Sequence, residues 1–385
     1  MKRKLWIIGA FLIMVPTVIG CTAQQSSTSS ITTSAATTTK NLPTISVPAA
    51  VSGIEMTLES IYTKVNPSVV LIQVVLPGSI LNPGGGALGS GFVWDSKGDI
   101  ITNNHVVDGA SSMTVTFYDG TTVDASLVGA DADSDLAVIK VNPSGLQLQP
   151  VTMGDSSAVQ VGQLAVAIVN PFGLENTMTV GFVSAIGRLL PANENATGPT
   201  YNIPDIIQID TPINPGNSGG VLLDDAGAVI GVTQSIATSS GSSAGVGFAI
   251  PSQIVKQVVP DLISKGHYDH PYLGLTVTSL DPNMAKAMNL PSGQRGALVE
   301  AVTSGGPADK AGIQASKTNF TDNGQQVTIG GDVIIAYNGQ TVKSSDDLVT
   351  MLANSGSVGQ KVTLTVLRNG KQIQVQVTLG LRPSS

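Results

Sequence analysis

Three residues of the chain have the side chains that nucleophilic acyl transfer requires, and they occur in the order His105, Asp135, Ser218. A serine hydroxyl is a poor nucleophile until a neighbouring imidazole takes its proton. The imidazole in turn needs a carboxylate, which fixes its tautomer and stabilises its protonated form. The order His, Asp, Ser is one of the known chain orders of such a triad. These three residues are therefore candidates for a catalytic triad.

The surroundings of Ser218 favour this interpretation. Taken alone, His105 is more often a structural residue, Asp135 a turn or capping residue, and a serine between glycines part of a tight turn. Here the three occur together, and His105 is the only histidine before residue 267. Glycines at 216, 219 and 220 allow the backbone to turn sharply. We therefore expect the backbone amides of Gly216 and Ser218 to form an oxyanion hole.

Two other patterns point to ligands but lack the required context. Gly84-x-Gly86-x-x-Gly89 has the spacing of a dinucleotide-binding loop, yet a strand and a turn follow it where that loop needs a helix. The aspartates at 131, 133 and 135 have the spacing of the first ligands of a calcium-binding loop. That loop needs glycine at its sixth position and glutamate at its twelfth, where this chain has leucine and asparagine. One cysteine and three histidines cannot build a Cys/His zinc cage. We expect neither a metal nor another cofactor.

The composition excludes two broad classes of protein. Only 12% of the residues are charged, and 19 basic against 26 acidic residues give a net charge of −7. No excess positive charge is available to neutralise phosphates, so we expect no nucleic-acid partner. A length of 385 residues with a single cysteine excludes a disulfide-stapled mini-protein. The length corresponds to about two to three domains.

The first 54 residues are expected to lie outside the fold. Three basic residues at positions 2–4 precede an apolar run that ends at Cys21, which is the pattern of a secretory signal. The ending Val-Ile-Gly-Cys resembles a bacterial lipobox, in which the cysteine is lipidated. The alternative is an uncleaved anchor with an incidental cysteine. We predict a signal peptide over residues 1–20, a Ser/Thr-rich flexible tether over 21–54, and an extracytoplasmic protein held to the membrane by lipid on Cys21.

Short segments rich in β-branched residues follow at regular spacing. This pattern is typical of an all-β barrel or sandwich pair. Helices are expected over 56–65 and 254–264. A second unit mixes strands with short helices and ends in a hairpin at Asn369-Gly370. We predict one domain over 55–264 and another over 265–385. The strands expected in the first are 68–75, 91–94, 100–102, 112–117, 136–141, 164–169, 178–184, 206–209, 220–223, 229–235 and 246–250.

Longer motifs surround the candidate residues and occur in order between about residues 55 and 381. They are Gly89-Ser90-Gly91-Phe92, Thr102-Asn103-Asn104-His105-Val106-Val107, Asp135-Leu136-Ala137-Val138, Asn170-Pro171-Phe172-Gly173, Val183-Ser184-Ala185-Ile186-Gly187-Arg188, Asn214-Pro215-Gly216-Asn217-Ser218-Gly219-Gly220 and Gly247-Phe248-Ala249-Ile250-Pro251. Together they resemble the HtrA/DegP family of serine proteases. They are far more specific than a lone Gly-x-Ser-x-Gly pattern.

The resemblance implies a mainly β fold, in which a chymotrypsin-like double six-stranded β-barrel is followed by a PDZ domain. It implies a serine endopeptidase, usually a homotrimer, that hydrolyses misfolded or regulatory extracytoplasmic proteins. Arg188 matches the loop arginine that senses activation in that family. A PDZ domain binds peptide C-termini with the backbone amides of one loop. The residues that match this loop are Tyr272, Leu273, Gly274 and Leu275.

The resemblance also locates a specificity pocket. In chymotrypsin-like proteases the residue at the base of the S1 pocket lies six positions before the nucleophile, which is Pro212 here, next to Ile213. A later segment with Ser235 and Ile236 borders the pocket by the same resemblance. None of these four residues is charged, and an unpaired Lys or Arg head group is costly to bury. We therefore expect cleavage after small or medium aliphatic residues.

The chain departs from the family pattern in three ways. Residues 314–330 enlarge the PDZ unit, where we expect a reshaped peptide groove. The segment 76–88 is short, whereas some relatives carry a long regulatory loop at this position. The single PDZ unit argues against cage-like oligomers. Two rival functions stay open: a proteolytically silent chaperone on the same fold, and a lipid-anchored PDZ scaffold in which the barrel is only a platform.

Overall fold

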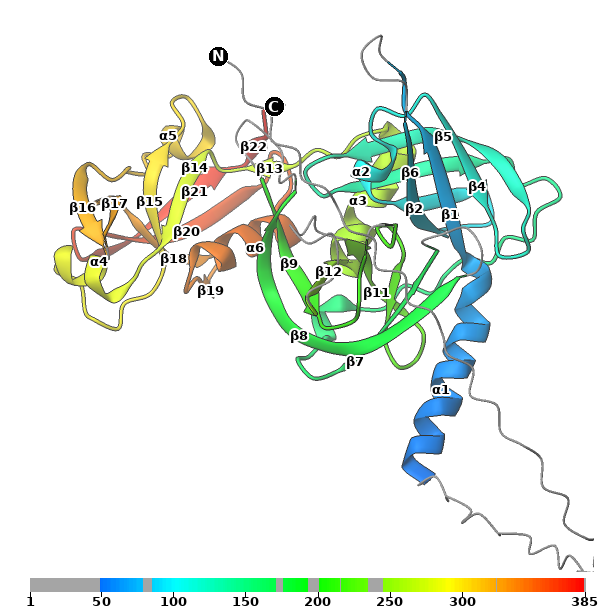
Figure 1. Cartoon of the computed structure of the whole chain (residues 1–385). Coiled ribbons are helices and arrows are strands. Elements are labelled where there is room, and N and C mark those ends of the chain that lie inside the picture. The colour runs from blue at the N-terminus through cyan, green and yellow to red at the C-terminus, as the bar shows by residue number, and fades with distance from the viewer. Residues whose placement is uncertain are drawn as a thin grey trace, which may run out of the picture. The chain divides into compact units, whose positions relative to one another are not determined.

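The computed structural model of the chain describes residues 49–78, 85–170, 176–192, 201–214, 216–234, 245–322 and 324–383. The predicted signal peptide, Cys21 and most of the predicted tether lie outside these ranges, as do Ser235 and Ile236. The described residues form two closed barrels and a smaller domain of mixed α and β structure (Figure 1). The expected pair of chymotrypsin-like six-stranded barrels is confirmed.

The first barrel consists of antiparallel strands closed in the order β1-β2-β3-β6-β5-β4. β5 was not expected, because it contains Asp and Gly, which are depleted in strands, and most of its side chains are exposed or half-buried. Pairing with β4 and β6 holds it in place. The strands are β1 Val69–Val75, β2 Gly86–Val93, β3 Asp99–Thr102, β4 Ser112–Thr116, β5 Thr122–Asp131 and β6 Leu136–Val141.

The second barrel is closed in the order β10-β11-β12-β9-β8-β7. Its longest strands, β8 and β9, pair well beyond the segments expected from the sequence, out to Pro191 opposite Asn202. The extension has exposed and polar residues, so its pairing partner and not its own pattern makes it a strand. The strands are β7 Leu164–Val169, β8 Thr177–Pro191, β9 Asn202–Ile209, β10 Val221–Leu223, β11 Val229–Gln234 and β12 Gly247–Pro251.

Two longer helices pack on the barrels. α1 spans Ala49–Val65, so the helix expected over 56–65 begins earlier in the chain than the sequence predicts. α3 spans Ser252–Lys265 and ends at Gly266, whose φ of +82° is a left-handed C-cap. Both helices share a core with residues of the two barrels. The short helical segments are η1 Asn66–Ser68, α2 Asn104–Val107 and η2 Ser156–Ala158.

No helix within the described ranges has the length and apolar character needed to cross a membrane.

The C-terminal domain has a sheet in the order β14-β15-β18-β20-β21, with β19 paired to β18 and β13 paired separately to β22. The expected hairpin is confirmed, since Asn369 and Gly370 both have positive φ between β20 and β21. The elements are β13 Pro271–Tyr272, β14 Leu275–Ser279, α4 Pro282–Ala287, β15 Ala297–Val302, α5 Pro307–Lys310, β18 Val333–Tyr337, β19 Gln340–Thr341, α6 Ser345–Ser355, β20 Lys361–Arg368, β21 Lys371–Thr378 and β22 Gly380–Leu381.

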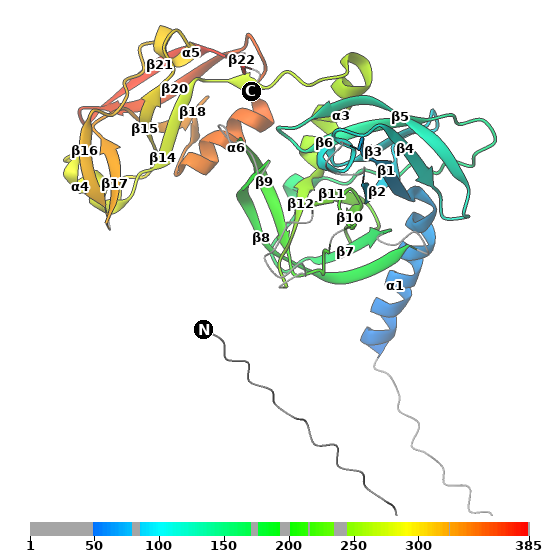
Figure 2. The ribbon, with the colours of Figure 1, turned by 45° about the horizontal axis from the view of Figure 1, so that its top comes forward.

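The inserted stretch 314–330 forms a separate two-stranded sheet, β16 Thr318–Asp322 and β17 Gln325–Ile329, next to α4 (Figure 2). The side-chain amide of Asn283 in α4 donates to Asp322 Oδ1 at 2.8 Å. Ile329 is part of a small buried cluster with Leu280 and Met284. The insert therefore has its own packing contacts within the domain.

Candidate active site

His105 lies at the start of a short helix whose first turn is fixed by Asp135. The side-chain amide of Asn103 and the backbone N–H of Asn104 both donate to the Asp135 backbone carbonyl, at 2.9 and 3.1 Å. His105 N donates to Asp135 Oδ1 at 2.9 Å. Asp135 itself has a φ of +51°, a left-handed conformation that aspartate tolerates better than most residues. Two donors to the backbone carbonyl and one to the carboxylate, on three consecutive residues, thus hold Asp135 against the His105 segment.

The imidazole of His105 and the carboxylate of Asp135 form a direct pair. Nδ1 of His105 lies 2.7 Å from Oδ2 of Asp135. The Asp135 side chain is 2% exposed, whereas that of His105 is 45% exposed. Because Nδ1 donates to the carboxylate, the neutral ring keeps its lone pair on Nε2. This is the tautomer that a general base requires.

Ser218 lies in the loop before β10, in the second barrel, and is 3% exposed. Within this loop Asn217 N donates to Asn214 O at 2.9 Å, and Gly216 has a φ of +93°. A left-handed third residue is the mark of a type II turn, which favours glycine at that position. The turn therefore needs the glycine that the sequence has at 216.

Gly219 allows the Ser218 segment to approach the strand that leads to His105. A Cβ atom on Gly219 would collide with the backbone oxygen of Ser90 and the hydroxyl of Thr102. Ser90 N also donates to Ser218 O at 2.8 Å. Thr102 is three residues before His105 in the chain. The structure thus brings the Ser218 segment of one barrel against the His105 segment of the other.

The expected specificity residues have different environments. Pro212 is exposed, and its carbonyl oxygen accepts from Thr179 Oγ1 at 3.4 Å. Ile213 is 5% exposed and belongs to the core of the second barrel, so it supports the loop more than it lines a pocket. Ser235 and Ile236 lie outside the described residues. Arg188 is exposed on β8 and is paired with Ile206 of β9.

The residues expected to bind peptide carboxylates span the tight connection between β13, which ends at Tyr272, and β14, which begins at Leu275. Gly274 has a φ of +76°, and its carbonyl oxygen accepts from Thr303 N at 2.9 Å. The carbonyl of Leu273, a buried residue, accepts from Ala308 N at 2.9 Å. The loop opens directly onto β14, which is the edge strand of its sheet. An edge strand can accept a further strand from a peptide.

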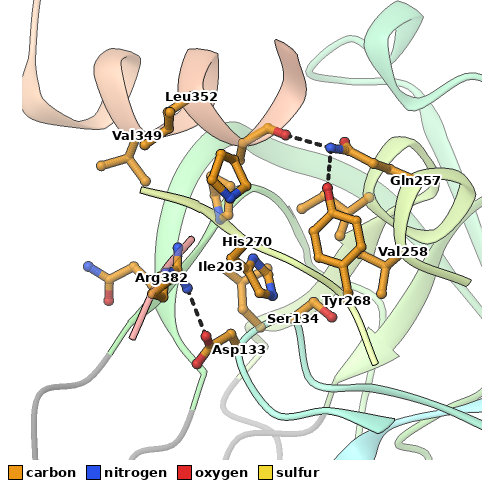
Figure 3. Close-up of a pocket in the computed structure, with 15 residues that line it drawn as sticks. Asp133, Ser134, Ile203, Gln257, Val258, Tyr268, His270, Val349, Leu352 and Arg382 are labelled. Atoms are coloured by element: carbon orange, nitrogen blue, oxygen red, sulfur yellow. Dashed lines mark hydrogen bonds and ion pairs between the residues drawn. The ribbon is translucent and has the colours of Figure 1, made fainter. Parts of the chain in front are cut away.

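A pocket lies where the segment before Asp135 meets the C-terminal domain (Figure 3). There His270 Nε2 lies 2.8 and 2.9 Å from the two carboxylate oxygens of Asp131, and Arg382 Nη1 lies 2.9 Å from Asp133 Oδ2. Burial raises the pKa of Asp131, but hydrogen bonds from His270 and Ser134 outweigh burial and hold this pKa below its ordinary value. The pocket is therefore a junction between domains, and neither His105 nor Asp135 lines it.

The same junction contains the described residues whose ligand atoms are close enough together to share a metal ion. They are Asp131, Asp133 and His270. Asp131 is already bound by His270, and Asp133 by the Arg382 guanidinium. A metal ion at this position competes with both of these pairs.

Four polar residues that support the site were not singled out individually from the sequence. Asn103 binds the Asp135 carbonyl, Thr233 Oγ1 donates to Asn217 O at 2.6 Å, and Ser90 and Thr102 lie at the contact between the barrels. For those that lie in strands, the signal is a polar residue beside apolar or glycine positions, as at Ser90, which lies in the buried second half of β2. Buried polar groups need partners, so such positions identify hydrogen-bonding sites.

Comparisons with known proteins agree with both domains. Residues 89–232 match the model of the trypsin-like peptidase domain, and residues 271–379 match the model of the PDZ domain. The chain is 37% identical to the chloroplastic protease Do-like 1 of Arabidopsis thaliana over 97% of this chain and 83% of that protein. It is 42% identical to a DegP-like periplasmic serine endoprotease of Brucella suis over 77% of this chain. The chain spans about half the length of the Brucella protein, 53% of which is covered.

Two solved structures are similar to this chain. The HtrA-type protease AlgW bound to a tripeptide is 33% identical, with a TM-score of 0.68 over 85% of this chain and 98% of that one. A serine endoprotease from Yersinia pestis is 28% identical, with a TM-score of 0.57 over 84% of this chain and 98% of that one.

Proposed function

The chain belongs to the HtrA/DegP family of serine proteases. From this premise we propose that it is a serine endopeptidase. In this proposal Ser218 is the nucleophile, His105 is the general base, and Asp135 orients the base. Its substrates are misfolded or regulatory extracytoplasmic polypeptides. The observation that carries the proposal is the buried carboxylate of Asp135 on Nδ1 of a half-exposed imidazole. A silent scaffold has no need of this pair, because burying a carboxylate is costly.

In the proposed reaction, His105 Nε2 takes the proton of Ser218 Oγ while Oγ attacks the carbonyl carbon of the substrate peptide bond. The carbonyl oxygen becomes an oxyanion and accepts hydrogen bonds from the amides of Gly216 and Ser218. His105 then gives the proton to the leaving nitrogen, the C–N bond breaks, and an acyl ester remains on Ser218. Water, deprotonated by the same nitrogen, hydrolyses the ester and restores the serine. Asp135 stays ionised and holds the proton on Nδ1.

Replacing the nucleophile tests this function. Ser218→Ala should cleave casein at least about 10³-fold more slowly than the natural chain, because no alkoxide can form. It should unfold at nearly the same temperature, since only one oxygen atom is lost. Cleavage is measured with purified protein, and the unfolding temperature by circular dichroism. Unchanged turnover in a homogeneous Ser218→Ala preparation would end the serine-protease assignment and leave the scaffold and chaperone alternatives.

For the C-terminal domain we propose a peptide site between β14 and α6. The loop Tyr272 to Leu275 then receives the terminal carboxylate on its backbone amides, while the peptide pairs with the free edge of β14. α6 begins beside the far end of this strand, where Ser345 Oγ lies 2.9 Å from Ser279 Oγ. Strand and helix thus define the two sides of the groove.

The charge of the peptide end is what this loop should recognise. A peptide with apolar C-terminal residues should bind the full-length Ser218→Ala chain, while its C-terminal amide should bind at least about tenfold more weakly, because charge-assisted hydrogen bonds are lost. Fluorescence anisotropy with the labelled peptide pair measures both affinities. Equal affinity of acid and amide would remove the carboxylate-binding role from this loop.

For the substrate side chain we propose an uncharged S1 pocket at Pro212, bordered by Ser235 and Ile236, with Ile213 supporting it from the barrel core. Each apolar CH₂ group buried there gains about 0.8 kcal/mol, whereas an unpaired cationic head group is strongly disfavoured. Mass spectrometry of fragments from an unfolded substrate should therefore place most cuts after Val, Ala, Ile or Leu. A majority of cuts after Lys or Arg would show that the pocket has been misplaced.

We further propose that Cys21 carries a lipid, which anchors the protein on the extracytoplasmic side of the membrane. We also propose that the protein assembles as a homotrimer and that Arg188 senses activation. The support is the lipobox-like ending of the signal segment, the exposed position of Arg188 and family membership.

Removing the proposed lipid site tests the anchor. Cys21→Ser should move the protein from the membrane fraction to the soluble fraction of expressing cells, because the lipid supplies the membrane affinity. Light scattering of the released protein should then give the mass of three chains. A Cys21→Ser protein that stays in the membrane fraction would mean that the apolar N-terminal segment is an uncleaved anchor, and a monomeric mass would remove the trimer.

A further inference from the structure

Ser90 forms hydrogen bonds with both barrels beside the candidate active site. It lies in β2 and is 0% exposed. Its backbone N–H donates to Ser218 O and its backbone carbonyl accepts from Thr102 Oγ1, both at 2.8 Å. Its hydroxyl donates to Gly216 O at 3.0 Å and accepts from Asn170 N at 2.8 Å. One buried residue thus links the strand before His105 to the segment that carries the nucleophile.

These contacts fix the direction of the Ser218 amide. The carbonyls of residues 216, 217 and 218 all accept hydrogen bonds, from Ser90 Oγ, Thr233 Oγ1 and Ser90 N in turn. The middle carbonyl and the Ser218 N–H belong to the same peptide, and in a trans peptide the two point in opposite directions. With the peptides on both sides held by Ser90, the middle one has little freedom to rotate. The Ser218 N–H is therefore aimed before any substrate binds.

The hydroxyl of Ser90 has only one direction in which to donate. Asn170 N approaches it as a donor, so the hydroxyl hydrogen is left for Gly216 O. Asn170 is itself anchored, because its side-chain amide donates to Asn176 Oδ1 at 2.7 Å. The side-chain amide of Asn176 donates in turn to Asn66 O at 2.9 Å. A buried polar network with satisfied members is rigid, and here it ends at the Gly216 carbonyl.

We propose that Ser90 is a positioning residue for the reaction: its hydroxyl holds the Gly216 to Ser218 segment so that the Ser218 amide, one of the two proposed oxyanion donors, is aligned before the transition state forms. This proposal rests on the serine-protease function proposed above. Alignment of donors acts on the transition state more than on the bound substrate. Loss of the hydroxyl should therefore lower kcat and leave KM nearly unchanged.

The chain contains a matched control for the loss of this hydroxyl. Ser252 is also 0% exposed, and its Oγ accepts from a backbone N–H, that of Ser156, at 3.0 Å and donates to a backbone carbonyl, that of Gly154, at 2.9 Å. These contacts involve none of the proposed catalytic residues. Ser90→Ala and Ser252→Ala thus remove the same kinds of hydrogen bond from equally buried positions, and general destabilisation should be similar in both.

The test measures kcat and KM on a peptide ester substrate for the natural chain, Ser90→Ala, Ser90→Cys and Ser252→Ala. Titration of each preparation with a fluorophosphonate gives the fraction of functional sites, so that kcat is expressed per functional site. Ser90→Ala should lose about 10- to 100-fold in kcat with KM within about twofold. Ser90→Cys keeps the packing with a weaker donor and should fall between Ser90→Ala and the natural chain. Ser252→Ala should keep the natural kcat.

The contrary results are distinguishable. If the natural chain neither turns over nor reacts with the fluorophosphonate, the proposed function itself fails. If the natural chain is active and Ser90→Ala has the same kcat per site, or loses only as much as Ser252→Ala, Ser90 has a structural role and no positioning role. If Ser90→Ala does not fold, Ser90→Cys decides: a natural kcat in that variant would overturn the proposal.

Discussion

The site depends on the contact between the two barrels, because neither barrel carries the full set of proposed catalytic groups. The first contributes His105 and Asp135, and the second contributes the turn with Ser218. The two segments meet where Gly219 packs directly on the Ser90 carbonyl and the Thr102 hydroxyl, a contact that leaves no space for a side chain. A core shared by both barrels and the helices α1 and α3 holds this contact in place. Residues far from the site thus maintain the geometry on which it relies.

Much of the fold was predictable because its buried strands are continuous apolar runs. β6, from Leu136 to Val141, coincides with its expected bounds, and the hairpin at Asn369-Gly370 follows from local turn chemistry. β5 and the β16–β17 pair could not be predicted, since their residues are mixed in polarity and pairing partners make them strands. The helix α1 begins earlier than expected, at Ala49, because its first turn has no acidic residue to mark a helix start.

The candidate residues were found from their chemical types, but the groups that hold them were not. Ser90 belongs to one of the family motifs, but its role is not evident from that motif, and only the fold shows that its hydroxyl contacts Asn170 and Gly216. The junction with the C-terminal domain is similar: His270 and Asp131 are 139 positions apart in the chain. Long-range pairs of this kind depend on the packed structure, which local patterns do not encode. They link the C-terminal domain to the segment that ends at Asp135.

The central claim is that one serine is made nucleophilic by the pair formed between His105 and Asp135. The most direct measurement is peptide mapping by mass spectrometry after reaction with a fluorophosphonate, comparing the natural chain with His105→Ala. The account predicts a single adduct per chain, on Ser218, which forms at least about 10³-fold more slowly in His105→Ala. An adduct on a different residue, no adduct on the folded natural chain, or equal rates in the two proteins would contradict it.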